Sequence, residues 1–414
     1  MSDLLRQGGH VHLIAICGVG MAALAGLLQS QGYRVTGSDQ NVYPPMSTYL
    51  ADLKIDVLSG YREEHLNEHP DLVVIGNAIS RDNPEAQEAL RLEVPYISFP
   101  QALGKFLIGS KKSIVVVGTH GKTTTTAIMA WVLAKAGRDP SFFVGGIPAN
   151  FESGFKQGGG AWVTLEGDEY DSAFFDKGPK FLHYKPENVI LTSLEFDHAD
   201  IYRDLEHLKS AFSHLTEIIS PSGTLLVCNE YEAAKAVSAS ARCRVSFYGD
   251  GEPKGWEARN VRVYEGRSSF EPVYQGTSEG GVEVSLMGHH NVNNALATYA
   301  MARKIGIDTQ VIREALATFS GVKRRQEVIG KVGEITVIDD FAHHPTAVKE
   351  TIDAIRAAYS EQRVWAIFEP RSNTSRRRIF EHEFSQALGL ADRVVVAGLY
   401  LPEKIPENDR LSPA

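Results

Sequence analysis

The sequence contains very little cysteine. Cys17, Cys228 and Cys243 are the only cysteines in 414 residues, and no CxxC pair or His/Cys cluster accompanies them. Disulfide-rich secreted scaffolds and zinc fingers both need closely spaced cysteines, so both classes are excluded. Few and scattered thiols favour a reducing compartment, and we therefore expect a cytoplasmic protein.

Positive charge is scarce as well. The 42 Lys and Arg residues are outnumbered by 51 Asp and Glu residues, which gives a net charge of −9. Proteins that bind nucleic acids usually carry a basic face, so we expect no nucleic-acid partner. One long apolar stretch, residues 11–28, contains His12, Gly18 and Gly20 and is followed by a second strand-like run at Tyr33. We interpret it as a buried βαβ unit rather than a signal peptide or membrane span.

The length and the pattern of the chain predict three α/β domains. A compact domain usually has about 100–200 residues, and this chain shows three blocks that each open with a short apolar strand before a turn or glycine loop. We place the domains at 1–106, 107–321 and 322–414, with a Rossmann-like first domain, a central mononucleotide-binding domain and a Rossmann-like third domain. About ninety residues follow Gly321, and we expect the third domain to be truncated.

The apolar runs predict individual elements. The expected parallel strands, the first helix (21–31) and an antiparallel flap (261–286) follow from hydrophobic periodicity. The strands lie at 10–17, 33–38, 72–76, 114–118, 162–166, 189–193, 335–339, 364–368 and 393–397.

A glycine loop follows the expected strand 114–118. It reads Gly118, Thr119, His120, Gly121, Lys122, Thr123, Thr124, a shortened form of the phosphate-binding loop in which Val116 replaces the first glycine. Backbone amides at the start of the following helix can cradle phosphate oxygens, Lys122 adds a positive charge, and the Thr123 hydroxyl suits Mg²⁺. The loop predicts ATP binding.

Acidic residues and a histidine follow the next two expected strands. Glu166 ends one strand and precedes Asp168, Glu169 and Asp171, while His198 follows the strand at 189–193. Ligands of open α/β sheets bind at the carboxyl ends of the strands. We therefore expect Glu166 to bind magnesium and His198 to act beside the phosphates, whereas the other three acids are as compatible with a solvated loop.

The first domain carries a dinucleotide-type fingerprint. Gly18, Gly20 and Ala23 match G-x-G-x-x-[GA], and Asp39 ends the second strand about twenty residues later. This pattern alone is compatible with NAD, but the diphosphate and ribose of a UDP group make the same contacts. The ligand of the first domain is therefore a nucleotide whose identity the fingerprint leaves open.

Polar clusters bracket the junction of the second and third blocks. Asn291 and Asn294 precede it and Arg325 follows it, and we expect them to contact the nucleotide. Arg371 follows the strand at 364–368 and is suited to bidentate binding of a carboxylate.

Taken together, these motifs resemble the Mur ligases, the ATP-dependent muramyl ligases of peptidoglycan metabolism. The resemblance covers nearly the whole chain, in order, through 118–124, 166–171, 197–198, 290–294 and 339–345. Within the family, the runs 38–47, 76–81, 173–177 and 369–374 are most similar to the members that join the tripeptide L-Ala-γ-D-Glu-meso-diaminopimelate to UDP-N-acetylmuramate during peptidoglycan recycling. Members that add L-alanine alone are the alternative.

The resemblance implies a set of site residues. By this resemblance, ATP would activate the lactyl carboxylate as an acyl phosphate, and the amine would then attack the acyl carbon and displace phosphate. The implied catalytic residues are Lys122, Glu166 and His198, with Thr123 and Glu166 as ligands of one magnesium ion and His198 as a ligand of a second. The glycine loop with Asn291, Asn294 and Arg325 would bind ATP. The UDP-sugar would bind at Gly18, Val19, Gly20, Met21, Ser38, Asp39 and Asn77, and the tripeptide at Arg371, Asn373 and His344.

Two other classes of function compete with a ligase. An NAD-dependent dehydrogenase explains Gly18, Gly20 and Asp39 but gives the Lys122 loop no task. A nucleotide switch that hydrolyses ATP explains the central loop but not the motifs at the strand ends of the third domain. A ligase accounts for both sets of motifs and remains our prediction. We expect it to act on small-molecule substrates and to have no membrane partner.

Overall fold

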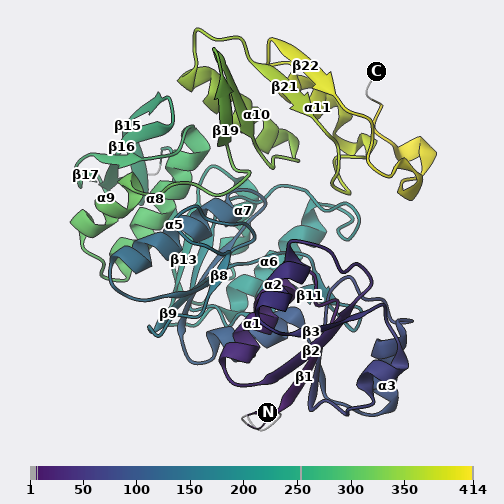
Figure 1. Ribbon diagram of the computed structural model, residues 1–414. Coiled ribbons are helices and arrows are strands. Elements are labelled where there is room, and N and C mark those ends of the chain that lie inside the picture. The colour runs from purple at the N-terminus through teal and green to yellow at the C-terminus, as the bar shows by residue number, and fades with distance from the viewer. Residues whose placement is uncertain (1–5, 7, 252–253, 413–414) are drawn as a thin grey trace.

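The computed structural model describes residues 6, 8–251 and 254–412. The three α/β units follow one another along the chain, with the first domain at the N-terminal end of the molecule and the third domain at the opposite end (Figure 1). The α/β architecture expected from the sequence is confirmed. The pattern of residues 410–414, with Ser412 as N-cap and Pro413 in the first turn, predicts the start of a helix, and residues 413–414 lie outside the described ones.

The first domain is a five-stranded parallel sheet in the order β3-β2-β1-β4-β5. The order reverses beside β1, and a ligand crevice forms at the carboxyl edge of such a sheet. Its elements are β1 (His10–Ile14), α1 (Val19–Ser30), β2 (Arg34–Asp39), α2 (Met46–Asp52), β3 (Asp56–Ser59), η1 (Glu63–Leu66), β4 (Leu72–Ile75), α3 (Pro84–Arg91) and β5 (Tyr96–Ser98). Two further turns of helix, α4 (Phe99–Ala102) and η2 (Leu103–Ile108), lead into the central domain.

The stretch 11–28 thus forms most of β1 and then α1, as the βαβ interpretation predicts. Among the described residues, no helix combines the length and the apolar character needed to cross a membrane.

The central domain is built on an eleven-stranded sheet in the order β17-β16-β15-β14-β13-β12-β6-β9-β7-β8, with β18 paired to β16. The strands are β6 (Lys112–Val117), β7 (Ser141–Phe143), β8 (Phe155–Lys156), β9 (Trp162–Glu166), β12 (Asn188–Leu191), β13 (Thr224–Cys228), β14 (Arg244–Tyr248), β15 (Trp256–Tyr264), β16 (Arg267–Tyr274), β17 (Thr277–Ser278) and β18 (Val282–Val284). β15 to β18 form the expected antiparallel flap. The central parallel strands are predominantly apolar because helices cover both faces.

The remaining elements of the central domain are helices and one small hairpin. They are α5 (Lys122–Lys135), β10 (Asp171–Ala173), β11 (Asp176–Pro179), η3 (Lys180–His183), α6 (Leu205–Ile218), α7 (Glu232–Ser238), α8 (His289–Lys304) and α9 (Thr309–Ala317). The core on the α5 and α8 side contains Ile114, Val116 and Val132, which are completely buried. This packing fixes the start of α5, where the glycine loop ends.

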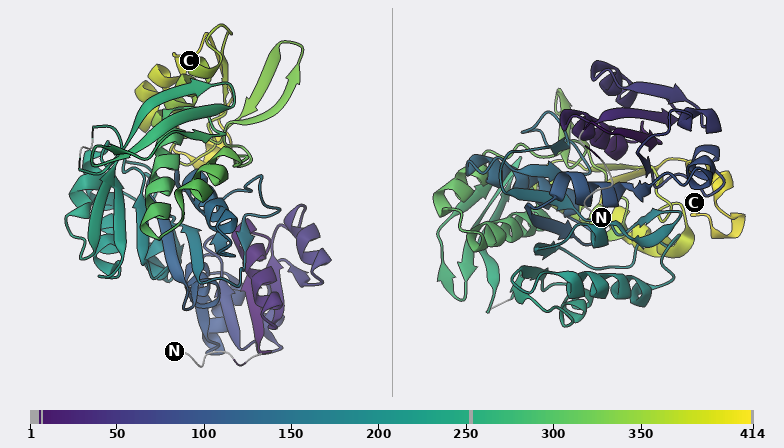
Figure 2. Two further views of the ribbon diagram at one scale, coloured as in Figure 1. Left: turned by 90° about the vertical axis from the view of Figure 1, so that its left-hand side faces the viewer. Right: turned by 90° about the horizontal axis from the view of Figure 1, so that it is seen from below.

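The third domain contains two separate pairs of strands. β19 (Glu327–Val332) and β20 (Ile335–Asp339) form an antiparallel hairpin that projects from the body of the molecule (Figure 2), whereas β21 (Trp365–Phe368) and β22 (Arg393–Val396) pair in parallel. The other elements are α10 (Pro345–Ala358), η4 (Arg378–Phe380), α11 (Glu381–Leu388), η5 (Pro402–Lys404) and η6 (Glu407–Asp409). The strand expected at 335–339 is therefore present, but its partner is β19.

A buried carboxylate organises the polar interior of the first domain. Glu85 on α3 is completely buried and accepts a hydrogen bond from the Ser38 hydroxyl. His12 and His65 lie 3.3 and 2.5 Å from its carboxylate oxygens. Burial acts to raise the pKa of Glu85, but the hydrogen bonds from His12, Ser38 and His65 hold the net pKa below its ordinary value.

Replacing Glu85 with Ala is expected to lower the free energy of unfolding by about 3 kcal/mol at pH 7, because its buried partners lose their acceptor. Because a depressed carboxyl pKa stabilises the fold only above its titration range, the difference from the native chain should shrink on acidification. Urea unfolding followed by circular dichroism measures both effects. Gln87→Ala, at an exposed position of the same helix, is the control and should change stability by less than about 0.5 kcal/mol. Equal losses in the two variants would contradict the role of Glu85.

Candidate active site

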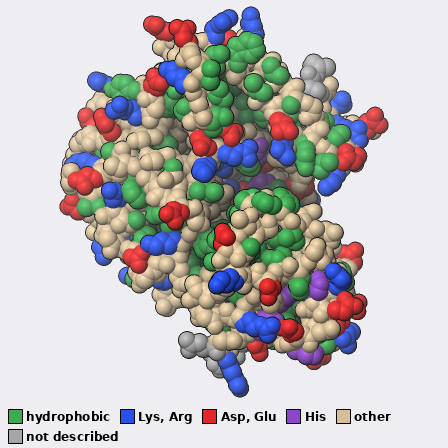
Figure 3. Space-filling model, in the orientation of Figure 1, with side chains coloured by type: hydrophobic (Ala, Val, Ile, Leu, Met, Phe, Trp, Pro, Cys, Tyr) green, Lys and Arg blue, Asp and Glu red, His purple; other side chains and the backbone are tan. Residues whose placement is uncertain are grey.

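One large cavity lies where the three domains meet. Its volume is about 580 Å³, and its wall includes residues of all three domains. The space-filling view shows a hollow between the two ends of the molecule, with basic and histidine side chains at its rim (Figure 3). Of the residues predicted from the sequence, the cavity wall contains Gly18, Gly20, Met21, Asn77, Thr119, His120, Gly121, Lys122, Thr123, Thr124, Glu166, His198, Asn291, Asn294, Arg325 and His344.

The glycine loop joins β6 to α5 in a tight turn. Gly118 and Gly121 have φ angles of 131° and 78°, in the region that favours glycine. A Cβ atom at Gly121 would lie 2.5 Å from Asn294 Oδ1, and one at Gly118 would lie 2.4 Å from Thr192 Oγ1. Only glycine therefore allows the loop to pack this closely against α8 and the end of β12.

The charge of Lys122 is held inside the protein by carboxylates. Its Nζ lies 3.0 and 2.9 Å from the two carboxylate oxygens of Glu169 and also donates to the Gly118 carbonyl, 2.5 Å away. Burial acts to lower the pKa of Lys122, but Glu169, Glu166 and Asp168 raise it above its ordinary value. The ammonium group is therefore charged at neutral pH and faces the cavity beside the loop.

Thr123 and Glu166 form an oxygen-rich pair at the start of α5 and the end of β9. The Thr123 hydroxyl donates to Glu166 Oε1 at 3.0 Å, and the other carboxylate oxygen accepts from the Gly145 amide at 2.8 Å. Arg325 of the third domain donates to Thr123 Oγ1 at 3.2 Å. Hydroxyl and carboxylate oxygens are the donors that Mg²⁺ prefers, so this pair fits a magnesium ion.

His198 contacts the same carboxylate as Lys122. Its Nε2 is 2.9 Å from Glu169 Oε1, and its backbone is left-handed with φ of 55°. Burial acts to lower the pKa of His198, while the hydrogen bond and charge of Glu169 raise it above the ordinary value. Glu169, which the sequence left undecided between ligand and loop acid, is only 2% exposed and links the two predicted catalytic residues.

The predicted nucleotide contacts of α8 lie next to the glycine loop. Asn294 Oδ1 accepts a hydrogen bond from Thr125 of α5 at 3.0 Å, and its amide nitrogen donates to Asn291 at 3.2 Å. Asn291 also donates to the Met287 carbonyl at 2.8 Å. Asn294 thereby fixes α8 against α5 at the wall of the cavity, and Asn291 supports Asn294 from the start of α8.

The predicted residues of the first domain separate into two groups. Gly18, Gly20, Met21 and Asn77 line the cavity, and Val19 is 71% exposed at the same loop. Ser38 is completely buried, and its hydroxyl faces Glu85 rather than the cavity. Asp39 accepts from the backbone amides of Cys17 and Asn41 at 2.9 and 2.8 Å and so shapes the loop before Gly18.

The predicted residues of the third domain also separate. His344 caps α10 and lines the cavity. Arg371 and Asn373 are not among the residues of its wall. The Arg371 guanidinium lies 4.4 Å from the centre of the Tyr400 ring, and Asn373 donates to Asp200 of the central domain at 2.9 Å.

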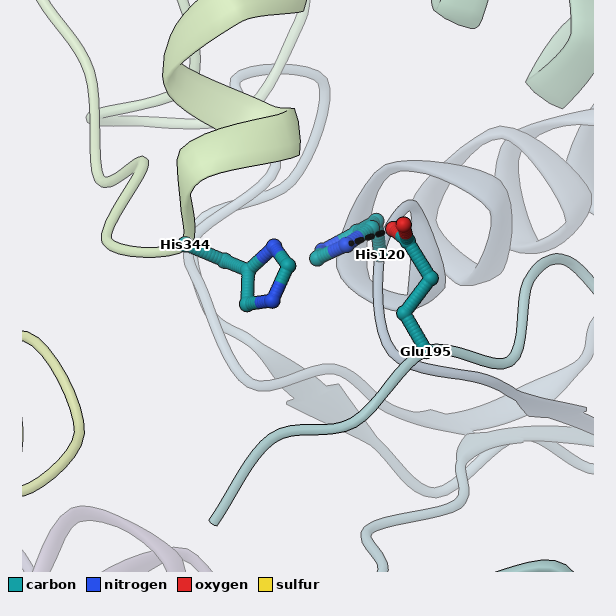
Figure 4. A group of neighbouring side chains, drawn as sticks. All are labelled: His120, Glu195 and His344. Atoms are coloured by element: carbon teal, nitrogen blue, oxygen red, sulfur yellow. Dashed lines mark hydrogen bonds and ion pairs between the residues drawn. The ribbon is translucent and has the colours of Figure 1, made fainter. Parts of the chain in front are cut away.

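His120, Glu195 and His344 gather at the boundary of the central and third domains (Figure 4). His120 Nε2 lies 2.8 Å from Glu195 Oε2, and the His120 and His344 ring centres are 4.6 Å apart. Glu195, which the sequence did not single out, stands three residues before His198. Its place in the run after β12 is the only signal that could have indicated it.

The fold and the cavity define a three-domain enzyme in which a phosphate-binding loop faces a second nucleotide-type fingerprint. Sequence comparison then identifies the family. Residues 10–111 match the Mur ligase family catalytic domain, residues 116–302 match the Mur ligase middle domain, and residues 324–410 match the Mur ligase glutamate ligase domain. The chain belongs to the Mur ligase family and is a ligase, which confirms the resemblance drawn from its motifs.

The relatives include both branches considered above. The chain is 40% identical over 397 residues to UDP-N-acetylmuramate–L-alanyl-γ-D-glutamyl-meso-2,6-diaminoheptandioate ligase of Escherichia coli, covering 96% of this chain and 86% of that protein. It is 36% identical to UDP-N-acetylmuramate–L-alanine ligase of Carboxydothermus hydrogenoformans, over 94% of this chain and 82% of that protein.

Solved structures give the same picture. A murein peptide ligase of Psychrobacter arcticus has a TM-score of 0.76 at 37% identity and covers 94% of this chain and 84% of its own. UDP-N-acetylmuramate-alanine ligase of Thermotoga maritima has a TM-score of 0.79 at 28% identity, with coverages of 96% and 86%. The backbone is thus similar in both branches, while sequence identity is higher to the peptide ligase.

The cavity also contains a carboxyl group with a raised pKa, which gives a pH prediction. Burial, with the nearby carboxylates of Glu195 and Glu230, raises the pKa of Glu350 on α10 to about 7. Between its ordinary pKa and 7 the folded protein binds more protons at this site than the unfolded chain, so stability falls as pH rises.

Glu350→Gln removes this titration. At each pH, the free energy of unfolding of the variant is compared with that of the native chain. The difference, variant minus native, is expected to be about 2 kcal/mol larger at pH 8 than at pH 5. Urea unfolding at the two pH values measures the difference. Glu403→Gln, at an exposed position of the same domain, should show no such dependence. If the difference in free energy of unfolding between the variant and the native chain is the same at pH 5 and at pH 8, the prediction of a neutral Glu350 is contradicted.

Proposed function

We propose that this chain joins the tripeptide L-Ala-γ-D-Glu-meso-diaminopimelate to the lactyl carboxylate of UDP-N-acetylmuramate, using ATP and Mg²⁺. The observation that carries the proposal is the single cavity in which the Lys122 loop faces the Gly18 and Gly20 loop of the first domain. The higher identity to the peptide ligase than to the L-alanine ligases supports the tripeptide as the amine substrate.

The reaction needs an activated carboxylate, because a carboxylate anion is a poor electrophile. A lactyl carboxylate oxygen attacks the γ-phosphorus of ATP, and ADP leaves with the electrons of the broken P–O bond. The amine nitrogen then attacks the acyl carbon, phosphate leaves, and the amine loses a proton. Phosphoryl transfer of this kind depends chiefly on positioning and on neutralising charge.

The residues of the central domain supply these two needs. The amides at the start of α5 and the Lys122 ammonium would bind the β- and γ-phosphates, and Arg325 brings a second positive charge from the third domain. Thr123 and Glu166 would hold one Mg²⁺ ion and His198 would bind a second, and these ions would supply charge neutralisation for phosphoryl transfer. Glu169 contacts both Lys122 and His198 and so holds the two side chains next to each other.

The first domain would bind the UDP-sugar. The amides of the Gly18–Met21 loop at the start of α1 suit a diphosphate, and Asn77 lies on the wall of the same cavity. A Cβ atom at Gly20 would lie 2.9 Å from the Phe99 ring and 3.3 Å from the Phe143 ring of the central domain, so this glycine lets the loop approach the central domain closely. Three free cysteines are typical of a reducing compartment and, with UDP-linked substrates, support activity in the cytoplasm. The proposed reaction belongs to peptidoglycan recycling.

Phosphate release tests the assignment. With ATP, Mg²⁺ and UDP-N-acetylmuramate, we expect release with the tripeptide and far less with L-alanine. Lys122→Ala should lower kcat about 100- to 1000-fold through the loss of a transition-state charge. Lys156→Ala, which breaks an exposed ion pair with Asp139, is the matched control and should retain activity.

The other results of this assay have distinct meanings. Release with L-alanine alone would assign the chain to the second branch of the family. Phosphate release without UDP-N-acetylmuramate and without an amine would indicate an ATPase. Near-normal turnover of Lys122→Ala would contradict the central role of this loop.

Arg371 and Asn373 are proposed to bind the distal diaminopimelate carboxylates. Both lie on the run after β21, beside the Ser372 and Thr374 positions of the cavity wall. Arg371→Ala should raise the KM for the tripeptide at least tenfold and leave the KM for ATP unchanged, because one charge-assisted bidentate pair is lost. Steady-state kinetics with each substrate varied in turn provide the measurement. An unchanged tripeptide KM would exclude this contact, and Arg378→Ala, an exposed arginine of the same domain, serves as the control.

A further inference from the structure

One carboxylate makes contacts in two domains. Glu195 follows β12 in the central domain, and its Oε2 lies 2.8 Å from Nε2 of His120 in the glycine loop. Its other oxygen, Oε1, accepts a hydrogen bond of 3.1 Å from the hydroxyl of Thr346. Thr346 belongs to the first turn of α10, in the third domain. The two oxygens of Glu195 therefore join the glycine loop to the third domain directly.

The central-domain end of this connection is rigid. The Glu195 amide donates to Thr119 Oγ1 at 2.9 Å, and the same hydroxyl donates to the Glu195 carbonyl at 3.1 Å. The His120 amide donates to Ser193 Oγ at 2.8 Å. The backbone around Glu195 and the glycine loop consequently move as one unit, and a displacement of the loop displaces the Glu195 carboxylate.

The third-domain end is equally well defined. His344, the residue that caps α10, accepts from the Thr346 amide through Nδ1 at 3.3 Å and contacts the Phe196 carbonyl through Nε2 at 3.2 Å. Its ring lies against His120 (Figure 4). Because both ring nitrogens are engaged, His344 has no free lone pair for a metal ion. The cluster of His120, Glu195 and His344 is thus a hydrogen-bonded connection rather than a metal site.

We infer that Glu195 is a positioning residue that couples the docking of α10 to the arrangement of the glycine loop. The inference rests on the proposed binding of ATP at that loop. A nucleotide that holds the loop in the arrangement seen here also holds His120 and Glu195 where Thr346 can bind. By reciprocity, docking of the third domain favours the ATP-bound arrangement of the loop by the same factor.

Amide hydrogen exchange tests the coupling in the absence of UDP-N-acetylmuramate and of any amine substrate. The probe is the ATP analogue adenylyl imidodiphosphate with Mg²⁺, added to the full chain and to two variants, Thr346→Val and Thr346→Ser. Valine removes only the hydroxyl that reaches Glu195, whereas serine retains it. In the native chain the analogue should slow exchange both at the glycine loop and at the first turn of α10, the latter about tenfold, as for loss of one hydrogen bond to a charged group.

The inference predicts that Thr346→Val keeps the protection at the glycine loop and loses the protection at α10, while Thr346→Ser keeps both. Full protection of α10 in Thr346→Val would overturn it. So would a native chain in which the loop is protected and α10 is not. Absence of protection at the glycine loop itself would refute the ATP assignment, and with it this inference.

A double-mutant cycle supplies a second test that a purely structural role would not satisfy. Glu195→Gln and Thr346→Val should each lower kcat/KM about tenfold, and the double variant should fall no further, because both substitutions break the same connection. Melting temperatures measured in parallel should be nearly equal among the three variants. Additive losses in kcat/KM would show that the two residues act independently and would overturn the coupling.

Discussion

A carboxylate buried between a lysine and a histidine is the interaction on which the centre of this protein depends. Glu169 is 2% exposed, and its oxygens lie within 3.0 Å of the Lys122 ammonium and the His198 ring. Burial acts to raise the pKa of Glu169, but Lys122 and His198 bring the net pKa below its ordinary value. An isolated charge in this place would be very unfavourable, and removal of one partner from a buried pair costs about 3–5 kcal/mol. The glycine loop and the run that contains His198 are therefore held together before any nucleotide binds.

This constraint works because of how the parallel sheet is ordered. β6, β9 and β12 are adjacent and parallel, so the segments that leave their carboxyl ends emerge side by side. These segments carry Lys122, Glu166 and His198 respectively. Residues that lie at least 32 positions apart in the chain thus reach one cavity, which is the general reason why ligands bind at this edge of α/β sheets.

The sequence was sufficient for the strands with continuous apolar runs and for the residues that stand immediately at their ends, but it did not indicate β13 and β14 of the central sheet. The strand at 162–166 and the contact of Thr123 with Glu166 follow from local pattern and from the known edge of the sheet. Side chains further along the loops could not be placed, because their direction depends on turns that no periodicity encodes. Glu169 and Glu195 belong to this group. Ser38 shows the same limit within a strand, since a buried partner on α3 decides which way its hydroxyl points.

Local sequence pattern also could not predict which strands of the third domain pair. Residues 335–339 have the apolar character of a strand, and that pattern is the same whether the neighbour is β19 or β21. The contacts of this domain with the rest of the chain combine polar pairs, such as those of Thr346, Asn373 and Arg325, with a small apolar cluster in which Ala354 and Tyr359 pack against Met287. Interfaces of this kind allow relative motion of domains. An acyl phosphate must be kept from water while the amine binds, so a mobile third domain must close at the moment the nucleotide is in place. A connection between α10 and the glycine loop provides that timing without any contact to the substrate itself.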